Sequence, residues 1–522
     1  MNISNADNSY DKVIYDALPH VQGNIRHLET IADLFCVNPV DVNRCRILEL
    51  GAGTGKTIIS QAENLPDSSF VGLDLGATQV ESGQQLIRTL DLKNVELKHA
   101  DIMEVDDSWG KFDYIIAHGV YSWVPQFVRD KIIDICSNNL GLNGVAMISY
   151  NTYPGWHFKE YARNLMFLHA VQGNDFPDAA TQIQQARSIV NYIAKRNKDL
   201  PNSYFTRFFD AFSRHLQVSD DHYVFHEYLE ANNAPCYFLD FCRKISEKNL
   251  RFVSEFVWNE YQAWRMDEEL NGLIEKLRHY EIAQQYMDYM VNRTFRASII
   301  CRGECSHEIR PDIITRYHFY VPYDCNFTLL DQHTPKKWLI KRDKGMDIRL
   351  YSNPFIDTFV DFLKRNRSRY FRYQEVWESL VAANGPHILD GQLDRKDFEQ
   401  TFEQILRYGL LQPILHPPRS DRDNQRPYVR GFVRQLAQHN SASLPNDLFE
   451  VHQVDSLTTA IIRRLDGRHA LADIVNELQK DLRNGRLTLS YQGYQIGADQ
   501  REQLSTIIGT TIERLRQYRF IV

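Results

Sequence analysis

Short apolar runs alternate with stretches of helical periodicity over the first part of the chain. Between residues 44 and 150 these runs are Cys45–Leu50, Phe70–Leu75, Val95–His99, Tyr114–Ala117 and Val145–Tyr150. Apolar strands separated by amphipathic helices are typical of βα units, which assemble into a parallel, doubly wound sheet. Ligands of such sheets bind at the carboxyl ends of the strands. We therefore expect a Rossmann-like α/β domain with its site where these runs end.

The pattern changes after residue 156. Residues 157–218 predict a helical insertion, because their apolar positions recur at helical spacing. Residues 219–302 return to an α/β pattern, and the runs Leu250–Phe256 and Thr294–Cys301 are candidates for the last strands of the same sheet. A structure that placed these two runs in another sheet would refute this assignment.

The C-terminal part of the chain has the pattern of two copies of one small module. Each copy has several short helices and an apolar end, which is Gly409–Leu411 in the first and Phe520–Val522 in the second. This order of elements predicts a winged-helix-like shape, and the last helices alternate acidic and basic residues, which favours contact with protein over DNA. Pro, Arg and Asp are frequent in residues 416–427, which we expect to form a linker.

The predicted fold class is α/β: a doubly wound Rossmann-like sheet with a helical insertion, followed by two small α+β winged-helix-like modules. The expected parts are a core at 1–156, the insertion at 157–218, a region at 219–302 that completes the sheet, a middle module at 303–415, the linker at 416–427 and a C-terminal module at 428–522.

Composition narrows the class of protein only a little. The 522 residues are too many for one hydrophobic core, and the net charge of −7 argues against affinity of the whole protein for nucleic acid or anionic membrane. No apolar run reaches the roughly 18 residues of a membrane span, and the N terminus lacks the apolar core of a signal peptide. We expect a soluble cytoplasmic protein with reduced thiols, and no metal site, since Cys301, Cys305 and His307 lack a fourth zinc ligand.

The segment Ile47–Thr57, ILELGAGTGKT, partly fits two glycine-loop motifs. A P-loop needs a glycine at position 50, where the chain has Leu50, so phosphate chemistry is disfavoured. The dinucleotide fingerprint needs a third glycine at position 56, which is Lys56. Neither nucleotide motif is therefore complete.

What remains is Glu49-x-Gly51-x-Gly53-x-Gly55 between a strand and a helix. The glycines allow close backbone approach to a ligand, whose carboxylate can meet free N–H groups at the start of the helix.

The second and third predicted strands both end on an acid. Asp74 closes the second strand at the position that hydrogen-bonds ribose hydroxyls. Asp101 and Ile102 follow the third strand and offer a carboxylate for an exocyclic amine and an aliphatic group for an adenine face.

With these residues in order, the chain resembles the class I S-adenosylmethionine (SAM)-dependent methyltransferases over approximately residues 40 to 150. The resemblance implies SAM as the cofactor. It implies that the methionine part contacts the loop, the ribose contacts the end of the second strand and the adenine contacts the end of the third. The implied cofactor-binding residues are Glu49, Gly51, Ala52, Gly53, Gly55, Asp74, Leu75, Asp101, Ile102 and His118.

Aromatic and polar residues follow the fourth and fifth strands, in AHGVYSWVP and SYNTYPGW. Aromatic faces attract cations such as the sulfonium of SAM, and Trp123 and Trp156 are candidates for that wall. Side chains that can hydrogen-bond an acceptor or relay its proton are Tyr121, Tyr153, Asn151 and His118. The alternative is that these aromatics only pack the ends of two strands.

These two segments, with residues 226–230, 286–289 and 292–296, resemble bacterial methyltransferases that carry a methyltransferase regulatory domain. That family includes the rickettsial protein lysine methyltransferases that modify outer membrane protein. The resemblance implies a regulatory region at 219–302, a dimerisation role for the insertion, a homodimer and a protein-lysine substrate. One departure is the stretch at residues 22–28, which reads QGNIRHL where family members often carry QTHPDRL.

Three interpretations of function stay open from sequence. The first is methyl transfer from SAM to protein lysine side chains. The second is methylation of a small metabolite or glycan precursor, and the third is a non-catalytic, SAM-binding regulatory protein.

Overall fold

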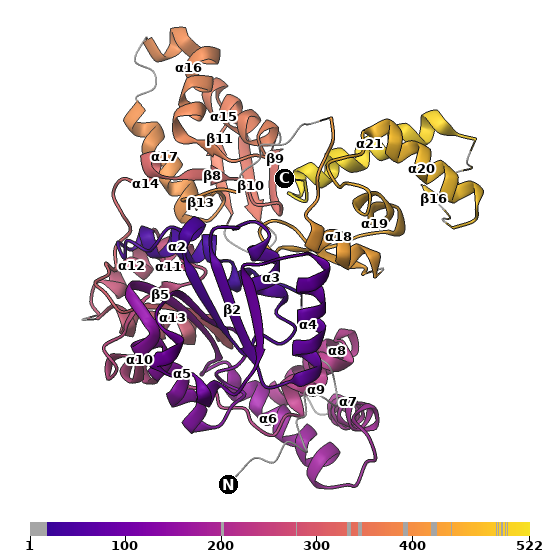
Figure 1. Cartoon of the computed structure of the whole chain (residues 1–522). Coiled ribbons are helices and arrows are strands. Elements are labelled where there is room, and N and C mark those ends of the chain that lie inside the picture. The colour runs from indigo at the N-terminus through magenta and orange to yellow at the C-terminus, as the bar shows by residue number, and fades with distance from the viewer. Residues whose placement is uncertain are drawn as a thin grey trace.

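The computed structural model describes residues 18–521 apart from 200–202, 278, 331–335, 343–346, 390–394, 419–424, 440, 487, 489, 492–493, 496 and 498. Part of the predicted linker, the first residues of the predicted core and Val522 lie outside the described residues. A central sheet lies between layers of helices, with a helical unit at one end and two small modules at the other (Figure 1).

Seven strands form the central sheet, in the order β3-β2-β1-β4-β5-β7-β6. They are β1 (Arg46–Leu50), β2 (Ser69–Asp74), β3 (Val95–His99), β4 (Phe112–Ala117), β5 (Leu140–Asn151), β6 (Arg251–Glu255) and β7 (Phe295–Cys301). The expectation that residues 250–256 and 294–301 complete this sheet is confirmed. The sheet is mixed rather than wholly parallel, because β7 runs antiparallel to both β5 and β6.

Alternate residues of each central strand enter different cores, as the two-residue period of a strand requires. Ile47 packs in the core on one face and Leu48 in the core on the other. The first face carries α2 (Ile25–Leu34), α3 (Lys56–Ala62) and α4 (Ala77–Thr89), and the second carries α5 (Gln126–Asn139) and α10 (Phe238–Ser246). Between β6 and β7 lie α11 (Asn259–Trp264), α12 (Glu268–Ile274) and α13 (Tyr280–Val291).

The insertion is a helical unit with its own apolar core. It contains α6 (Trp156–Phe167), α7 (Ala179–Arg196), α8 (Tyr204–Val218) and α9 (Asp221–Tyr228). Polar caps start two of these helices, since Asp178 accepts from the Thr181 N–H at 2.8 Å and Ser203 accepts from the Thr206 N–H at 3.2 Å. Val224 and Tyr228 of α9 are fully buried in the same core, so the helical unit extends beyond residue 218.

The middle module contains two three-stranded sheets, β11-β10-β9 and β12-β8-β13. Its elements are α14 (Ile313–Arg316), β8 (His318–Tyr320), β9 (Cys325–Leu330), β10 (Lys337–Arg342), β11 (Ile348–Tyr351), α15 (Pro354–Arg365), β12 (Phe371–Arg372), α16 (Tyr373–Leu389), α17 (Arg395–Arg407) and β13 (Gln412–Ile414). The C-terminal module has no counterpart to β9–β11 among its described residues.

The C-terminal module consists of short helices and hairpins. Its elements are α18 (Gly431–Gln438), β14 (Ser443–Pro445), β15 (Val451–Gln453), α19 (Ser456–Ile462), α20 (Leu471–Arg483), β16 (Ser490–Tyr491), β17 (Tyr494–Gln495) and α21 (Arg501–Gln517). It docks on the core through Glu63, which accepts from the backbone N–H groups of Gly431 and Phe432 at 2.6 and 3.0 Å.

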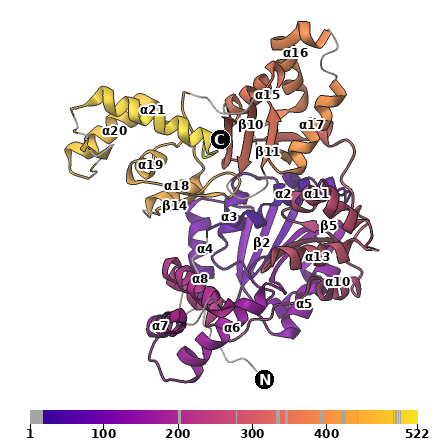
Figure 2. The same cartoon turned by 180° about the vertical axis from the view of Figure 1, so that it is seen from behind.

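The insertion and the two modules lie at opposite ends of the core. Both views place α6–α9 below the sheet and α15–α21 above it (Figures 1 and 2). Within the described part of the chain, no helix combines the length and apolar character needed to cross a bilayer.

Candidate active site

The loop between β1 and α3 depends on its glycines. Gly51 and Gly53 have φ values of +68° and +55°, in the left-handed region that side chains disfavour. A Cβ on Gly51 would lie 2.3 Å from Val120 Cγ2, so a glycine is needed for the loop to pack against the end of β4. A Cβ on Gly53 would have no atom within 4 Å, because this part of the loop borders a cavity.

Asp74, the last residue of β2, braces the same loop. Its Oδ2 accepts a hydrogen bond from the Gly53 N–H at 2.7 Å, and its Oδ1 accepts one from the Gly76 N–H at 2.8 Å. The carboxylate therefore fixes the loop while it lines the cavity beside it.

One cavity of about 390 Å³ joins these groups at the carboxyl ends of the strands. Most of the residues expected to bind the cofactor line it, and so does Trp123. These lining residues are Glu49, Gly51, Ala52, Gly53, Asp74, Leu75, Asp101, Ile102 and His118. Gly55 does not line it, since a Cβ there would face Leu97 at 3.1 Å.

Glu49 is a buried acid with an unused oxygen. The residue is 5% exposed, and its Oε2 has no hydrogen-bond partner among the described residues. Burial, together with the charge of Asp74, raises the pKa of Glu49 from 4.5 to about 8, although hydrogen bonds from Thr57 and Ile58 oppose the shift. A cation placed beside this oxygen would convert an unfavourable buried acid into an ion pair.

Asp101 and His118 border other parts of the cavity. Asp101 Oδ1 accepts from the Met103 N–H at 2.9 Å and so caps the turn Ile102–Glu104, which leaves Oδ2 for a ligand. The ring of His118 stacks on that of His20 with centroids 4.3 Å apart. Burial lowers the pKa of both imidazoles, so they stay neutral and do not repel a positively charged ligand.

A second wall of the cavity comes from α9, and sequence reasoning missed it. Tyr223, His226 and Glu227 line the cavity from this helix. Their i, i+3, i+4 spacing puts them on one helix face, which is the signal that could have found them. Lys159 Nζ of α6 donates to Glu227 Oε1 at 2.9 Å.

Two predicted aromatic residues do not reach the cavity. Tyr121 is 1% exposed and packs edge-on against Tyr150 and Phe241, with centroids 6.1 and 5.8 Å away. Trp156 is fully buried behind Trp123, with their rings 6.5 Å apart in a T-shaped arrangement. Both side chains support the end of the sheet from behind, which is the packing role considered as the alternative.

Asn151 and Tyr153 are also set back from the cavity. Asn151 Nδ2 donates to Asn233 Oδ1 at 3.2 Å, so this side chain anchors the segment that follows α9. The Tyr153 hydroxyl donates to Glu160 Oε2 at 3.0 Å, and burial and that carboxylate raise the pKa of Tyr153 to about 12. Neither residue is among those that line the cavity.

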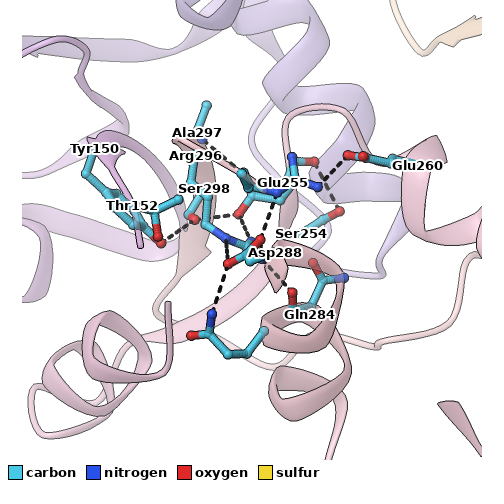
Figure 3. Close-up of polar contacts among 12 residues, drawn as sticks. Tyr150, Thr152, Ser254, Glu255, Glu260, Gln284, Asp288, Arg296, Ala297 and Ser298 are labelled. Carbon is cyan, nitrogen blue, oxygen red and sulfur yellow. Dashed lines mark hydrogen bonds and ion pairs between the residues drawn. The ribbon is translucent and has the colours of Figure 1, made fainter. Parts of the chain in front are cut away.

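A buried ionic network lies behind the turn that carries these residues (Figure 3). Arg296 donates to both oxygens of Asp288, at 2.9 and 2.7 Å, and to Glu255 Oε1 at 2.5 Å. Arg293 also binds Asp288, and its backbone oxygen accepts from the Gly155 N–H at 3.0 Å. The network thereby fixes the turn from which α6 starts.

The cavity fits SAM group by group. The unpartnered Glu49 oxygen suits the α-ammonium of the methionine part, and the glycine loop and α3 offer N–H groups to its carboxylate. Asp74 suits the ribose hydroxyls, while Asp101 and Ile102 suit the adenine. The strand order and this cavity define the protein as a SAM-dependent methyltransferase.

Family models match three parts of the chain. They are described as a methyltransferase domain at residues 41–203, a predicted methyltransferase regulatory domain at 220–302 and the PKMT C-terminal winged helix domain at 425–519. The uncharacterised protein RP028 of Rickettsia prowazekii is 37% identical over 250 residues, which is 47% of this chain and 98% of that protein. Another, RP789 of the same organism, is 28% identical over 518 residues, which is 97% of this chain and 92% of that protein.

The chain is also similar to a solved structure over nearly its whole length. PKMT2 from Rickettsia typhi superposes with a TM-score of 0.83 and 25% identity, covering 97% of this chain and 100% of that one. A second structure of PKMT2 is a complex with AdoHcy. The chain belongs to the family of these rickettsial proteins, methyltransferases with a regulatory domain and a PKMT-type winged helix domain.

Proposed function

We propose that the protein transfers methyl groups from SAM to lysine side chains of other proteins. The observation that carries the proposal is the likeness to PKMT2, which extends through all parts of the chain, including the winged helix domain. The sequence resemblance to rickettsial protein lysine methyltransferases points to the same acceptor. The aromatic and acidic wall beyond the cofactor half of the cavity suits a cationic amine.

In this proposal the cofactor residues have separate roles. Glu49 and the backbone of Gly51–Gly53 hold the methionine end, and Asp74 holds the ribose. Asp101 and Ile102 hold the adenine, with Leu75 beside it. Trp123 faces the sulfonium, and neutral His118 adds no opposing charge.

Lysine as acceptor sets a chemical condition. With a pKa of about 10.4, a free lysine is neutral only about one time in a thousand near pH 7.4, a cost of roughly 4 kcal/mol. The cofactor supplies a methyl group on sulfur; the amine lone pair forms the new C–N bond as the S–C bond breaks and its electron pair stays on sulfur. The chain's task is therefore to align the amine and receive the proton that it loses beforehand.

Transfer of labelled methyl from SAM tests the proposal in a lysate of the source cell, split into protease-treated and nuclease-treated halves. We expect protease to release the label from high-molecular-weight material and nuclease to leave it. Label that enters only small molecules would refute a protein acceptor.

The proposal extends to assembly and organisation. An exposed apolar face on α6, the turn after it and α8 is a candidate homodimer surface; it comprises Phe158, Tyr161, Leu168, Tyr204 and Phe205. The two modules at the far end of the core would contact the substrate protein away from the cavity. The reaction would take place in the cytoplasm, where SAM is made. Light scattering during size exclusion tests the dimer, and a Tyr161→Glu, Phe205→Glu variant should be monomeric.

A further inference from the structure

Glu227 differs from the other cavity residues discussed above because it combines an ion pair on one carboxylate oxygen with a second oxygen that accepts no hydrogen bond from the described residues. Its side chain is 16% exposed and contributes to the cavity wall. Oε1 accepts from Lys159 Nζ at 2.9 Å, whereas Oε2 accepts no hydrogen bond from any described residue. A carboxylate that is mostly removed from water gains free energy when a second donor reaches it.

The surroundings of Glu227 already hold one ammonium group. Lys159 lies over the Trp156 ring with Nζ 5.2 Å from its centroid, and Tyr223 also interacts with it. Burial opposes the charge of Lys159, but Glu227 and Tyr223 together keep its pKa above the usual range. Glu227 and Tyr223 of the cavity wall, with the Trp156 ring buried behind them, thus already hold one lysine ammonium through a carboxylate, a phenol and an indole face.

The helix that carries Glu227 is fixed at both ends. Asp221 at its start pairs with Arg187 of α7 at 2.8 Å. Beyond its end, the Ala234 N–H donates to the Ser122 carbonyl at 2.8 Å, and Asn233 accepts from Asn151. Trp123 directly follows Ser122 in the chain. The hydrogen bond from Ala234 to Ser122 therefore links the segment after the Glu227 helix to the segment that carries Trp123.

We propose that Glu227 is the binding site for the ammonium group of the methyl acceptor, received by its free oxygen between α9 and Trp123. Lys159 occupies the other oxygen and keeps the carboxylate oriented toward the cavity. The site selects primary amines that carry a positive charge and rejects neutral acceptors of the same shape. This inference rests on the proposed function, since it names the group that recognises the lysine.

The first test separates this site from catalysis by measuring binding alone. The AdoHcy-saturated protein is titrated with n-butylammonium, which mimics the end of a lysine side chain, and with 1-butanol as the neutral control. The parent should prefer butylammonium by about tenfold or more, as expected for a hydrogen bond to a charged group. Glu227→Gln should abolish the preference, because the amide keeps a hydrogen-bond acceptor for Lys159 but loses the charge.

The second test uses a lysine-containing protein substrate. Glu227→Gln should raise KM about tenfold or more and leave the Kd for AdoHcy and the unfolding midpoint close to those of the parent. Asp210→Asn is the matched control, since it removes an exposed carboxylate of the same helical unit, on α8 and outside the cavity, and it should match the parent in KM.

Two results would overturn the assignment: no preference of the parent for butylammonium over butanol, or an equal preference in Glu227→Gln. Failure of the proposed function looks different. In that case the parent prefers butylammonium, as this site predicts, but transfers no label to protein.

Discussion

The pKa of Glu49 gives the sharpest prediction for cofactor binding. Its raised value of about 8 means that the carboxyl is mostly protonated at neutral pH when nothing occupies the cavity. A ligand ammonium beside Oε2 favours the carboxylate, so binding must release a proton. Affinity for AdoHcy, which keeps the α-ammonium of SAM, should therefore rise with pH.

The magnitude follows from the ionised fraction of Glu49. With a pKa of about 8, that fraction is roughly one in a hundred at pH 6 and about one half at pH 8, so affinity should rise roughly fiftyfold between them. In the unliganded protein, stability changes with pH in the opposite direction to affinity. In the unfolded chain Glu49 has a pKa near 4.5 and loses its proton above that pH, whereas the folded state keeps the proton up to about pH 8. The free energy of unfolding therefore falls as pH rises from 4.5 to about 8.

Calorimetric titration with AdoHcy at pH 6, 7 and 8, in buffers of different ionisation enthalpy, measures both the affinity and the protons released. The parent should release close to one proton at pH 6 and about half of one at pH 8. Glu49→Gln should bind more weakly than the parent at pH 8, with little dependence on pH and no proton release. A parent whose affinity is constant across this range would refute the assigned role of Glu49.

Four further substitutions test other parts of the protein. Gly51→Ala places a Cβ 2.3 Å from Val120 Cγ2 at positive φ, so it should lower the free energy of unfolding by about 1–3 kcal/mol and weaken AdoHcy binding; stability equal to that of the parent would contradict this. Arg296→Met leaves the carboxylates of Asp288 and Glu255 buried without their main partner, at a cost of about 3–5 kcal/mol, seen as a lower unfolding midpoint. An unchanged midpoint would show that the network is not needed for stability. Trp123→Ala should lose turnover but keep AdoHcy binding, because Trp123 lines the cavity. Trp156→Phe should keep both, because Trp156 does not line it. Loss of turnover in Trp156→Phe but not in Trp123→Ala would show that Trp156, and not Trp123, acts in the reaction.

The strands of the core could be predicted because each is a buried apolar run, and their ends carry the chemistry. Glu49 is the last residue but one of such a run, Asp74 is the last residue of another, and Asp101 lies two residues after a third. The direction of β7 could not be predicted, because a buried apolar strand has the same pattern in either direction. The additional sheet β9–β11 could not be predicted for a different reason: its strands are short and half-buried, so none forms a continuous apolar run.

The acceptor side was harder to predict than the cofactor side. An aromatic residue after a strand has the same sequence signal whether it faces a cavity, as Trp123 does, or packs behind it, as Trp156 does. Glu227 lies about a hundred residues from Trp123 along the chain, and a polar helix face normally contacts solvent. Only the packing of α9 against α6 and α7, with the hydrogen bond from the Ala234 N–H to the Ser122 carbonyl, brings these two residues to one cavity.

The identity of the methylated amino acid tests the proposed function most directly. Purified protein is incubated with methyl-labelled SAM and lysate protein, either untreated or with its lysines fully acetylated beforehand, and the acid hydrolysate of the protein fraction is separated by chromatography. We expect methylated lysine to carry the label from untreated protein, with no label after acetylation. Label that persists at the same level on acetylated protein, or that elutes as another amino acid, would contradict a protein lysine methyltransferase.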